Sequence, residues 1–246
     1  MIDNISVVLI AQNAQDTIEE CLASLVDFSE VILYLNGSTD TTKEIGMQFS
    51  NVKIVEGNFL GFGKTKNKAA SYSSNEWILS LDSDEILNKN IIKNIIDADF
   101  SKINNVYILK RDNYFLGATT VSKDFIVRVY NTKHTKFNDN MVHEKVMIHN
   151  DTNKVTLKGS FKHLNIIDIN QTLTKMIQYT DLGAKDKKLC FFLVVILKAT
   201  FAFFQTYFLK FYIINGWRGF TVAVTYANRR FYKYLKQYIN CQKEKS

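Results

Sequence analysis

The first hundred residues alternate between short apolar runs and amphipathic segments. The apolar runs are typical of buried strands and are ISVVLIA (5–11), VILYL (31–35), VKIV (52–55) and WILSL (77–81). The intervening segments have helical spacing and cover 16–28, 41–49 and 63–73. Near-continuous apolar strands separated by helices indicate a parallel sheet that is covered on both faces. The pattern therefore predicts an α/β domain.

The segment at 16–28 shows how these helices are expected to begin. Ile18, Leu22 and Leu25 fall on one stripe of a helix. Asp16 precedes the stripe and Glu19 stands three residues later, which is the spacing of a capping box. We expect Asp16 to cap this helix.

Polar loops follow three of the four predicted strands. They are AQN (11–13), NGSTD (36–40) and DSDE (82–85). In a parallel sheet the carboxyl ends of the strands meet at one edge, where ligands bind. The three loops are therefore expected to form one site.

The third loop places three carboxylates directly after an apolar strand. Asp82 and Asp84 form a D-x-D, whose oxygens suit Mg²⁺ or Mn²⁺, and a metal would relieve their mutual repulsion. The alternative is that these acids begin the helix expected at 88–96. Glu85 is interpreted as a helix-start residue or as a neighbour of the metal pair.

The pattern changes after residue 105. Short strands with polar breaks, VYILK, FIVRVYN and KVTLKG, predict an antiparallel extension of the same sheet, and 170–188 reads as a helix. Asp124 and Arg128 are four residues apart, so they share a face of the second of these strands.

Length and composition support a folded chain that forms either one large domain or a domain plus an appendage. Hydrophobic residues make up 46% and charged residues 22% of the 246 positions. The three cysteines have wide spacings without a metal pattern, so we expect them to be reduced. The N-terminal run is short and no basic residue precedes it, so it is expected to be the first strand and not a signal peptide.

The net charge of +7 is concentrated near the C-terminus. Residues 187–243 hold ten Lys or Arg, no Asp or Glu, and 16 of the 32 aromatic residues. Within 187–210, Lys187, Lys198 and Gln205 fall on one stripe of an otherwise apolar helix. This pattern is typical of a helix in a membrane interface, and the basic residues downstream favour an anionic surface. The alternatives are a helix that packs in a core and a basic, aromatic nucleic-acid surface; we expect no nucleic acid partner.

Several motifs occur in an order that resembles a known family. They are ISVVLIAQNAQDTIEECLASL, NGSTDTT, GFGKTKN, WILSLDSDE, NYFLG, VHE and YFLKFYIINGWRGF. The chain resembles the family 2 glycosyltransferases of the GT-A fold, and within them the WaaE-type lipopolysaccharide inner-core β-1,4-glucosyltransferases. The resemblance implies an inverting transfer from a nucleotide sugar, usually UDP-glucose, with Mg²⁺ or Mn²⁺ bridging the diphosphate.

The resemblance also implies roles for residues of the donor site. Ala11 and Asn13 would line the nucleotide pocket, Asp82 would lie near the ribose and metal, and Lys66 would lie beside the base and diphosphate. Asn36 stands where relatives have an Asp that accepts the uracil N3–H. An amide oxygen can accept the same hydrogen bond without charge assistance. For Lys66 the alternative is a solvated helix lysine.

The remaining roles concern the metal, the base and the acceptor. Asp84 would be the direct metal ligand, and His163 would complete the metal or diphosphate site, the alternative being a core histidine. Glu144 matches the V-H-E motif and is our candidate base for the acceptor hydroxyl, the alternative being an ion pair with Lys145 or a neighbour. Asp124 and Arg128 are expected to contact the acceptor.

These observations predict a GT-A catalytic domain at 1–186, with a nucleotide-sugar half (1–100) and an acceptor half (101–186), and a membrane-association segment at 187–246. The expected reaction moves a hexose from a UDP-sugar to a lipid-linked acceptor, the lipopolysaccharide or lipooligosaccharide inner core, at the cytoplasmic face of the cell membrane. The alternatives are a transferase that acts on polyprenyl phosphate and an inactive GT-A membrane scaffold, which Asn36 alone supports.

Overall fold

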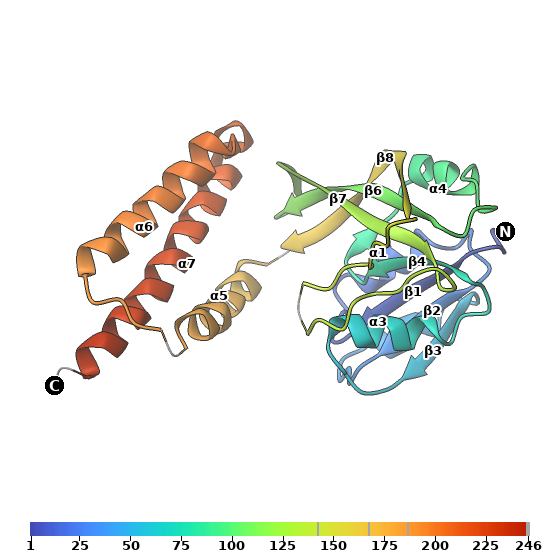
Figure 1. Cartoon of the computed structure of the whole chain (residues 1–246), viewed down its shortest axis with the longest axis horizontal. Coiled ribbons are helices and arrows are strands. Elements are labelled where there is room, and N and C mark those ends of the chain that lie inside the picture. Colours follow the sequence, from blue (N-terminus) through green and yellow to red (C-terminus); the bar gives the residue numbers. More distant parts are fainter. Residues whose placement is uncertain (142, 167, 186, 245–246) are drawn as a thin grey trace. The chain divides into compact units, whose positions relative to one another are not determined.

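The computed structural model describes residues 1–141, 143–166, 168–185 and 187–244. These residues form two compact units. Unit 1 comprises Met1–Asp112 and Lys123–Leu164, and unit 2 comprises Asn113–Ser122 and Asn165–Ser246. Figure 1 shows both units with their elements. The helix after residue 168 belongs to unit 2, so the units divide at residue 164, ahead of the composition shift near 187.

The first half of unit 1 is the predicted parallel sheet. Its strands are β1 (Ser6–Ala11), β2 (Val31–Leu35), β3 (Val52–Glu56) and β4 (Trp77–Asp82). They pair in parallel in the order β3-β2-β1-β4, and β4 then pairs antiparallel with β7. The full order is β3-β2-β1-β4-β7-β6-β8-β5, a mixed sheet of eight strands. The predicted α/β fold with a mixed sheet is confirmed.

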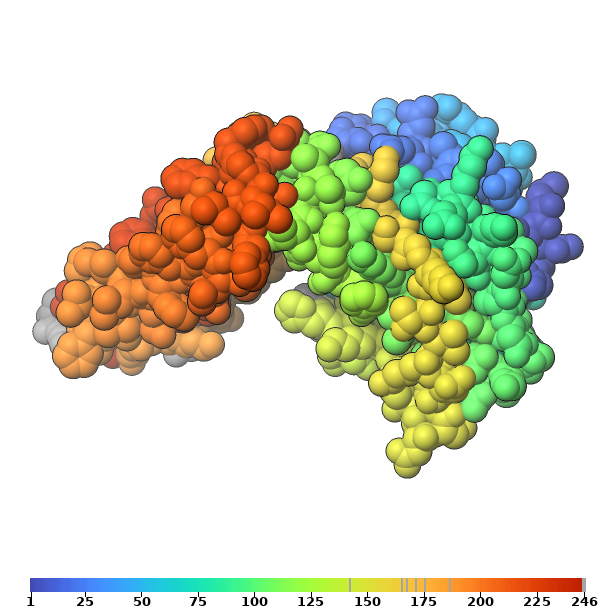
Figure 2. Space-filling model, turned by 90° about the horizontal axis from the view of Figure 1, so that it is seen from above, coloured from blue at the N-terminus to red at the C-terminus, as the bar shows by residue number. Residues whose placement is uncertain are grey.

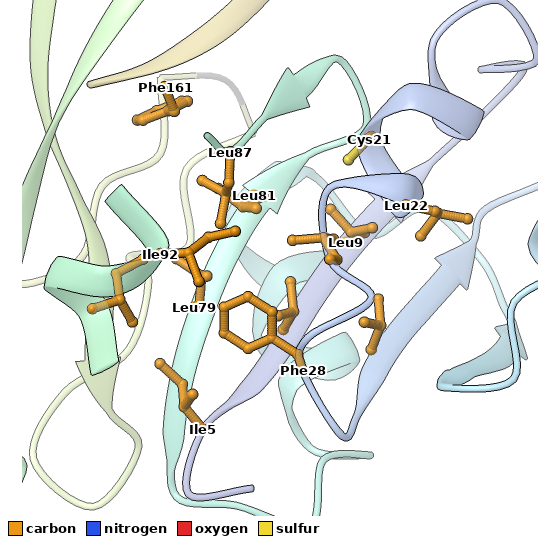
Figure 3. Close-up of a cluster of buried hydrophobic side chains, with 14 of the residues drawn as sticks. Ile5, Leu9, Cys21, Leu22, Phe28, Leu79, Leu81, Leu87, Ile92 and Phe161 are labelled. Atoms are coloured by element: carbon orange, nitrogen blue, oxygen red, sulfur yellow. The ribbon is translucent and has the colours of Figure 1, made fainter. Parts of the chain in front are cut away.

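Helices cover both faces of this sheet, so β1 and β2 are buried along their whole length. Val7 and Leu9 point to one face and pack with α1 (Ile18–Ala23) and α4 (Lys89–Ile96). Figure 3 shows this cluster, with Leu9 and Leu79 from the strands and Ile92 from α4. The alternate residues, Val8 and Ile10, face a second cluster that includes the end of α3 (Phe62–Ala70). The period-2 alternation of strands therefore fills two cores from one continuous apolar run.

One prediction and one alternative interpretation about helix starts are wrong. Asp16 caps no helix, because α1 begins at Ile18 after Thr17 and has no side-chain cap. The carboxylates at 82–85 do not begin α4 either. They lead into the short strand β5 (Glu85–Ile86), and Asn88 caps α4 by accepting the N–H of Ile91 at 3.0 Å. The short helix α2 (Thr42–Gly46) follows β2 as expected.

The antiparallel extension consists of β6 (Asn105–Phe115), β7 (Ala118–Asn131) and β8 (Asn153–Ile166). The turn between β6 and β7 places Leu116 and Gly117 at positive φ, as tight hairpin turns require. β8 also pairs antiparallel with β5, which brings Glu85 opposite His163. The extension therefore returns to the loop that carries the carboxylates.

Unit 2 is built mainly from helices: α5 (Ile169–Ala184), α6 (Phe192–Phe204) and α7 (Gly216–Lys243). A π-helical turn η1 (Gln205–Leu209) and a 3₁₀ turn η2 (Tyr212–Asn215) join α6 to α7. α7 packs against both α5 and α6. Lys236 of α7 binds the Asp181 carboxylate of α5 at 2.7 Å.

The prediction of three reduced cysteines is wrong, because Cys190 and Cys241 form a disulfide. The two cysteines are 51 residues apart in the sequence, so their spacing gives no indication that they pair. The folding back of α7 along α6 brings the start of one helix beside the end of the other, where Leu189 N–H donates to the Gln237 carbonyl at 3.2 Å. Cys21 is the free, buried cysteine.

The stretch Phe192–Leu209 is long and apolar enough to cross a membrane, judged by length and composition alone. Only 17% of it is buried within the structure. In the space-filling view the orange side chains of α6 form a continuous surface of unit 2 (Figure 2). The exposed large apolar residues of this stretch include Leu193, Leu197, Phe201, Phe204 and Phe208. Lys198 is set apart from them because its Nζ lies over the ring of Tyr234 on α7, 4.8 Å from the centroid.

Candidate active site

The carboxyl ends of β1, β2 and β4 meet at one edge of the sheet. Ala11 pairs with Leu35, and Ile10 pairs with Asp82. The N–H of Asn36 donates to the carbonyl of Ala11 at 3.1 Å. The structure therefore places the three polar loops at the same edge, as the strand pattern predicted.

The first two of these loops are tied to each other by side chains. Asn13 lies at a positive φ of 52°, and its N–H donates to Ser38 Oγ at 3.2 Å. The side-chain carbonyl of Asn13 accepts the N–H of Thr39 at 2.8 Å. Asp40 accepts the N–H of Thr42 at 3.1 Å, so it braces the start of α2. These contacts hold the loops that the predicted nucleotide pocket needs in a fixed shape.

Helix α3 carries Lys66 into the interior of unit 1. A Cβ on Gly63 would lie 1.8 Å from the carbonyl oxygen of Asn138, so only glycine permits this close approach of α3 to the chain at 138–140. Asn67 fixes the same contact by exchanging two hydrogen bonds of 2.9 Å with the backbone of Phe137. Lys66 is 3% exposed, so the alternative of a solvated helix lysine is wrong.

The segment that carries Glu144 folds back on itself over α3. Phe137 and Val146 form an antiparallel bridge, and His143 adopts a left-handed φ of 60° just before Glu144. Glu144 Oε1 lies 2.7 Å from Lys66 Nζ, which also lies 2.8 Å from Asp82 Oδ1. Lys66 therefore joins the candidate base to the carboxylate at the end of β4.

The opposite side of Asp82 is held by an arginine from β7. Arg128 contacts Asp82 Oδ2 at 2.8 Å and also binds Glu85, which is fully buried. Glu85 in turn accepts a hydrogen bond from Arg111 at 3.2 Å, and Arg111 binds Asp124 at 2.8 Å. Seven side chains thus form one chain of alternating charge, which we call the charge chain: Asp124, Arg111, Glu85, Arg128, Asp82, Lys66 and Glu144.

The charge chain perturbs the ionisation of its buried members. Burial acts to raise the pKa of Asp82, but Lys66 and Arg128 outweigh it and hold that pKa well below its usual range. Burial acts to lower the pKa of Lys66, and the nearby Asp82 carboxylate instead raises it. Glu85 differs, because burial raises its pKa and Arg128 offsets this only in part. Lys66 and Asp82 are therefore charged at neutral pH.

Asp84 turns away from this chain and meets His163 of β8. Asp84 Oδ2 lies 3.4 Å from His163 Nε2, and the Leu164 N–H donates to the Asp84 carbonyl at 2.9 Å. Two ligands of one Mg²⁺ at about 2.1 Å, at neighbouring octahedral positions, lie about 3.0–3.4 Å apart. Among the described residues no group of three or more His, Cys, Asp or Glu side chains is placed to hold a metal. One carboxylate with an imidazole fits a cation that keeps water and binds substrate phosphates.

A cleft of about 890 Å³ opens beside the charge chain. Its wall includes five of the predicted site residues: Lys66, Asp82, Asp124, Arg128 and Glu144. The other five do not line it: Ala11, Asn13, Asn36, Asp84 and His163. A volume of this size is typical of small-molecule sites. The structure therefore brings the candidate base and the predicted acceptor residues to one cavity.

Sequence reasoning missed one member of the charge chain, because Arg111 was given no role. Arg111 directly follows the predicted strand VYILK, and this position was the available signal, since a charged side chain at the end of a buried strand needs a partner. Glu85 was expected to be a helix-start residue or a neighbour of the metal pair; the first alternative is wrong, and Glu85 lies beside Asp82, whose N–H it accepts at 3.1 Å. Arg128 is expected to contact the acceptor; it is 3% exposed, binds Asp82 and Glu85, and lines the cleft.

Comparison with known proteins identifies this architecture. Residues 6–164 match the family described as Glycosyl transferase family 2. An uncharacterised glycosyltransferase of Rickettsia felis is 27% identical over 254 residues, covering 95% of this chain and 89% of the relative. One from Rickettsia prowazekii is also 27% identical, with 94% and 86% coverage.

A solved structure supports the fold. The crystal structure of S. aureus TarS 1–349 in complex with UDP aligns with 99% of this chain and 92% of its own, at 17% identity and a TM-score of 0.50. At this identity the likeness concerns the fold alone. The family match covers the whole of the parallel sheet, the charge chain and the cleft. The chain belongs to glycosyl transferase family 2 and is a glycosyltransferase of the GT-A fold.

Proposed function

We propose that this glycosyltransferase moves a hexose, with glucose the favoured sugar, from a UDP-sugar to a lipid-linked acceptor, with inversion at the anomeric carbon. The acceptor we favour is the lipopolysaccharide or lipooligosaccharide inner core. The observation that carries the proposal is the position of Lys66, which binds Asp82 and Glu144 through one ammonium group. A donor-edge carboxylate and a candidate base thereby meet at the wall of one cleft.

The donor is proposed to bind at the edge formed by the three loops. Ala11, Asn13 and Asn36 would surround the nucleotide, and Asp82 would lie near the ribose. The TarS structure that shares this fold contains UDP, which supports a uridine donor. Asn36 would accept the uracil N3–H through a neutral amide oxygen, so this contact is weaker than one made by a carboxylate.

The metal is proposed to be Mg²⁺ or Mn²⁺, held by Asp84 and His163. Such an ion supplies positive charge that stabilises the departing diphosphate. Two protein ligands leave most of the coordination shell to water and to donor phosphates. Since Lys66 and Arg128 already occupy both oxygens of Asp82, Asp84 is the carboxylate of the D-x-D that remains for the ion.

Glu144 is proposed to remove the proton of the acceptor hydroxyl as it attacks the anomeric carbon. Its Oε1 binds Lys66, and within the described part of the chain its Oε2 forms no hydrogen bond or ion pair. One oxygen is thus fixed while the other remains for a hydroxyl in the cleft. We propose that Asp124, which is 41% exposed at its side chain, contacts the acceptor, and that Arg128 orients Asp82 at the wall of the cleft.

Unit 2 is proposed to hold the enzyme on the cytoplasmic face of the membrane. The exposed apolar surface of α6 would lie among the lipids, and the basic residues of 187–243 would meet anionic headgroups. A lipid-linked acceptor accounts for such a surface, because enzyme and acceptor then meet in two dimensions. A helix that packs into a core is disfavoured, since 17% of Phe192–Leu209 is buried.

A donor screen tests the proposal. The purified chain is mixed with Mg²⁺ or Mn²⁺ and a panel of nucleotide sugars, and release of the nucleotide is measured. We expect metal-dependent UDP release that Asp84→Ala abolishes and the control Asp97→Ala, an exposed residue after α4, retains. Full activity of Asp84→Ala would overturn the metal assignment. No release from any nucleotide sugar would favour the inactive scaffold instead.

A further inference from the structure

The wall of the cleft belongs mostly to the antiparallel half of unit 1. It is built from β6, β7, the segment 143–148 and the start of β8, together with Lys66 and Asp82. The loops at the ends of β1 and β2 do not reach it. If the donor binds as proposed, most of this cavity receives the acceptor. The assignment of this cavity to the acceptor rests on that proposed function.

Cationic side chains outnumber carboxylates along this wall. Six lysines and arginines line it: Lys66, Arg111, Lys123, Arg128, Lys145 and Lys154. Three carboxylates line it, and all three belong to the charge chain: Asp82, Asp124 and Glu144. Glu85 does not line the cleft, but it binds Arg111 and Arg128 and so neutralises part of the excess positive charge. Lys123 lies 2.9 Å from Asp112.

Two of these cations remain without a carboxylate. Lys145 and Lys154 are both exposed, and neither forms an ion pair with any described residue. Cations that are gathered in a cleft with low-dielectric walls raise the local concentration of anions. The charge of this cavity therefore selects for a negatively charged ligand.

Apolar side chains lie among these lysines. Phe125 is 64% exposed and Ile148 is 43% exposed, although both line the cleft. Ile108, Ile126 and Val146 extend the apolar wall. Large exposed apolar side chains that share a cleft with polar groups are typical of ligand sites. The cleft thus combines apolar surface with unpaired positive charge.

We infer that the acceptor carries a phosphate group, which Lys145 and Lys154 bind beside the apolar surface formed by Phe125 and Ile148. Two sources share this chemistry: a phosphorylated sugar of a core oligosaccharide, and a polyprenyl phosphate. In the first, a sugar hydroxyl attacks the anomeric carbon, its proton passes to Glu144 and UDP leaves; in the second, an oxygen of the phosphate itself attacks, no proton is removed and UDP leaves. In both, the two lysines bind the acceptor phosphate, and Asp84 would hold the metal for the donor diphosphate.

The test compares matched acceptor pairs with the full-length chain and the UDP-sugar found by the donor screen. One pair is polyprenyl phosphate and the neutral polyprenol. The other is a phosphorylated core oligosaccharide and the same oligosaccharide after phosphatase treatment. We expect kcat/KM to be about tenfold higher for the phosphorylated member of one pair, since each of the two exposed ion pairs contributes up to about fivefold. The favoured pair identifies the source of the phosphate.

Substituting Lys145 and Lys154 tests whether these two lysines bind the phosphate. The double variant Lys145→Ala/Lys154→Ala should lose about tenfold in kcat/KM for the phosphorylated acceptor, and its preference over the neutral acceptor should disappear. The control Lys136→Ala/Lys158→Ala changes two exposed lysines nearby in the sequence that do not line the cleft, and it should behave as the parent. Added NaCl should raise KM for the phosphorylated acceptor only.

The outcomes separate this inference from the proposed function. Equal transfer to phosphorylated and neutral acceptors would overturn the inference and leave the glycosyltransferase reaction intact. Retained phosphate preference in the double variant would also overturn it. Failure of every donor to release nucleotide would instead overturn the proposed function.

Discussion

Replacing Glu85 with Gln should destabilise unit 1 severely. Glu85 has no exposed surface, and its carboxylate binds Arg128 and Arg111 and accepts the N–H of Asp82 at 3.1 Å. A glutamine of the same shape removes the negative charge and points an amide group at two guanidinium groups. Arg128, which is 4% exposed at its side chain, then keeps Asp82 as its one carboxylate partner among the residues of the charge chain, and Lys66 binds that same carboxylate.

The magnitude follows from the burial of the partners. Removing one member of a buried ion pair costs about 3–5 kcal/mol, because the remaining charge stays desolvated. With a urea m-value of about 2 kcal/mol/M for a domain of this size, the unfolding midpoint should fall by about 1.5 M or more. Asp124→Asn is the matched control at the exposed end of the charge chain. Its partner Arg111 keeps Glu85, so the loss should stay below about 1 kcal/mol.

The two tryptophans allow unit 1 to be followed alone. Trp77 lies in the core of unit 1, 4.9 Å from Phe100 between ring centroids, and Trp217 is 60% exposed in unit 2. Urea unfolding in a Trp217→Phe background therefore reports unit 1 through Trp77 fluorescence. Equal midpoints for Glu85→Gln and Asp124→Asn, or a shift below about 0.3 M for both, would refute the reasoning that burial sets the energy of this chain.

Three further predictions concern other parts of the molecule. The pKa of Lys66 is raised, so the stabilisation that its charge gives the folded state is complete below the unfolded pKa of about 10.4 and is lost only above it. Lys66→Met should therefore lower the free energy of unfolding by the same amount from pH 6 to pH 9. A difference between variant and parent that shrinks near pH 7 would contradict this. Cys241→Ser opens a loop of 51 residues and should destabilise unit 2, followed through Trp217 fluorescence, by up to about 4 kcal/mol; an unchanged transition would show that the disulfide is dispensable. Replacing Phe201 and Phe204 with Ser should reduce co-sedimentation with anionic liposomes several-fold, and undiminished binding would exclude the α6 surface as the contact.

The sequence predicted the parallel half of unit 1 well because its strands are buried on both faces. A run such as VILYL has no polar position, and its two neighbouring strands flank it in the sheet. The three polar loops could be assigned to one edge for the same reason, since parallel strands end together. The antiparallel strands were predicted too short. β7 contains exposed and partly exposed residues from 118 to 127, where periodicity alone gives a weak signal.

The partners of the charged residues could not be predicted from the sequence. Lys66 and Glu144 are 78 residues apart, and their contact depends on the glycine that lets α3 approach Asn138. The disulfide depends in the same way on α7 folding back along α6. Local patterns determine which residues are buried, whereas the pairing of distant side chains is determined by the packing of elements.

The three carboxylates at the end of β4 each have a partner of their own, which offsets part of their mutual repulsion without a metal; Asp82 and Asp84 still act to raise the pKa of Glu85. Asp82 lies between Lys66 and Arg128, Asp84 lies beside His163, and Glu85 lies between two arginines. The alternation of side chains around β5 sends Asp84 and Glu85 to different neighbours. We therefore expect unit 1 to fold in EDTA with the same cooperative Trp77 transition. Mg²⁺ at a concentration equal to its Kd should then add only about 0.4 kcal/mol through mass action. Loss of the cooperative transition on chelation would show instead that the carboxylates need the ion in order to fold, and that the charge chain does not suffice.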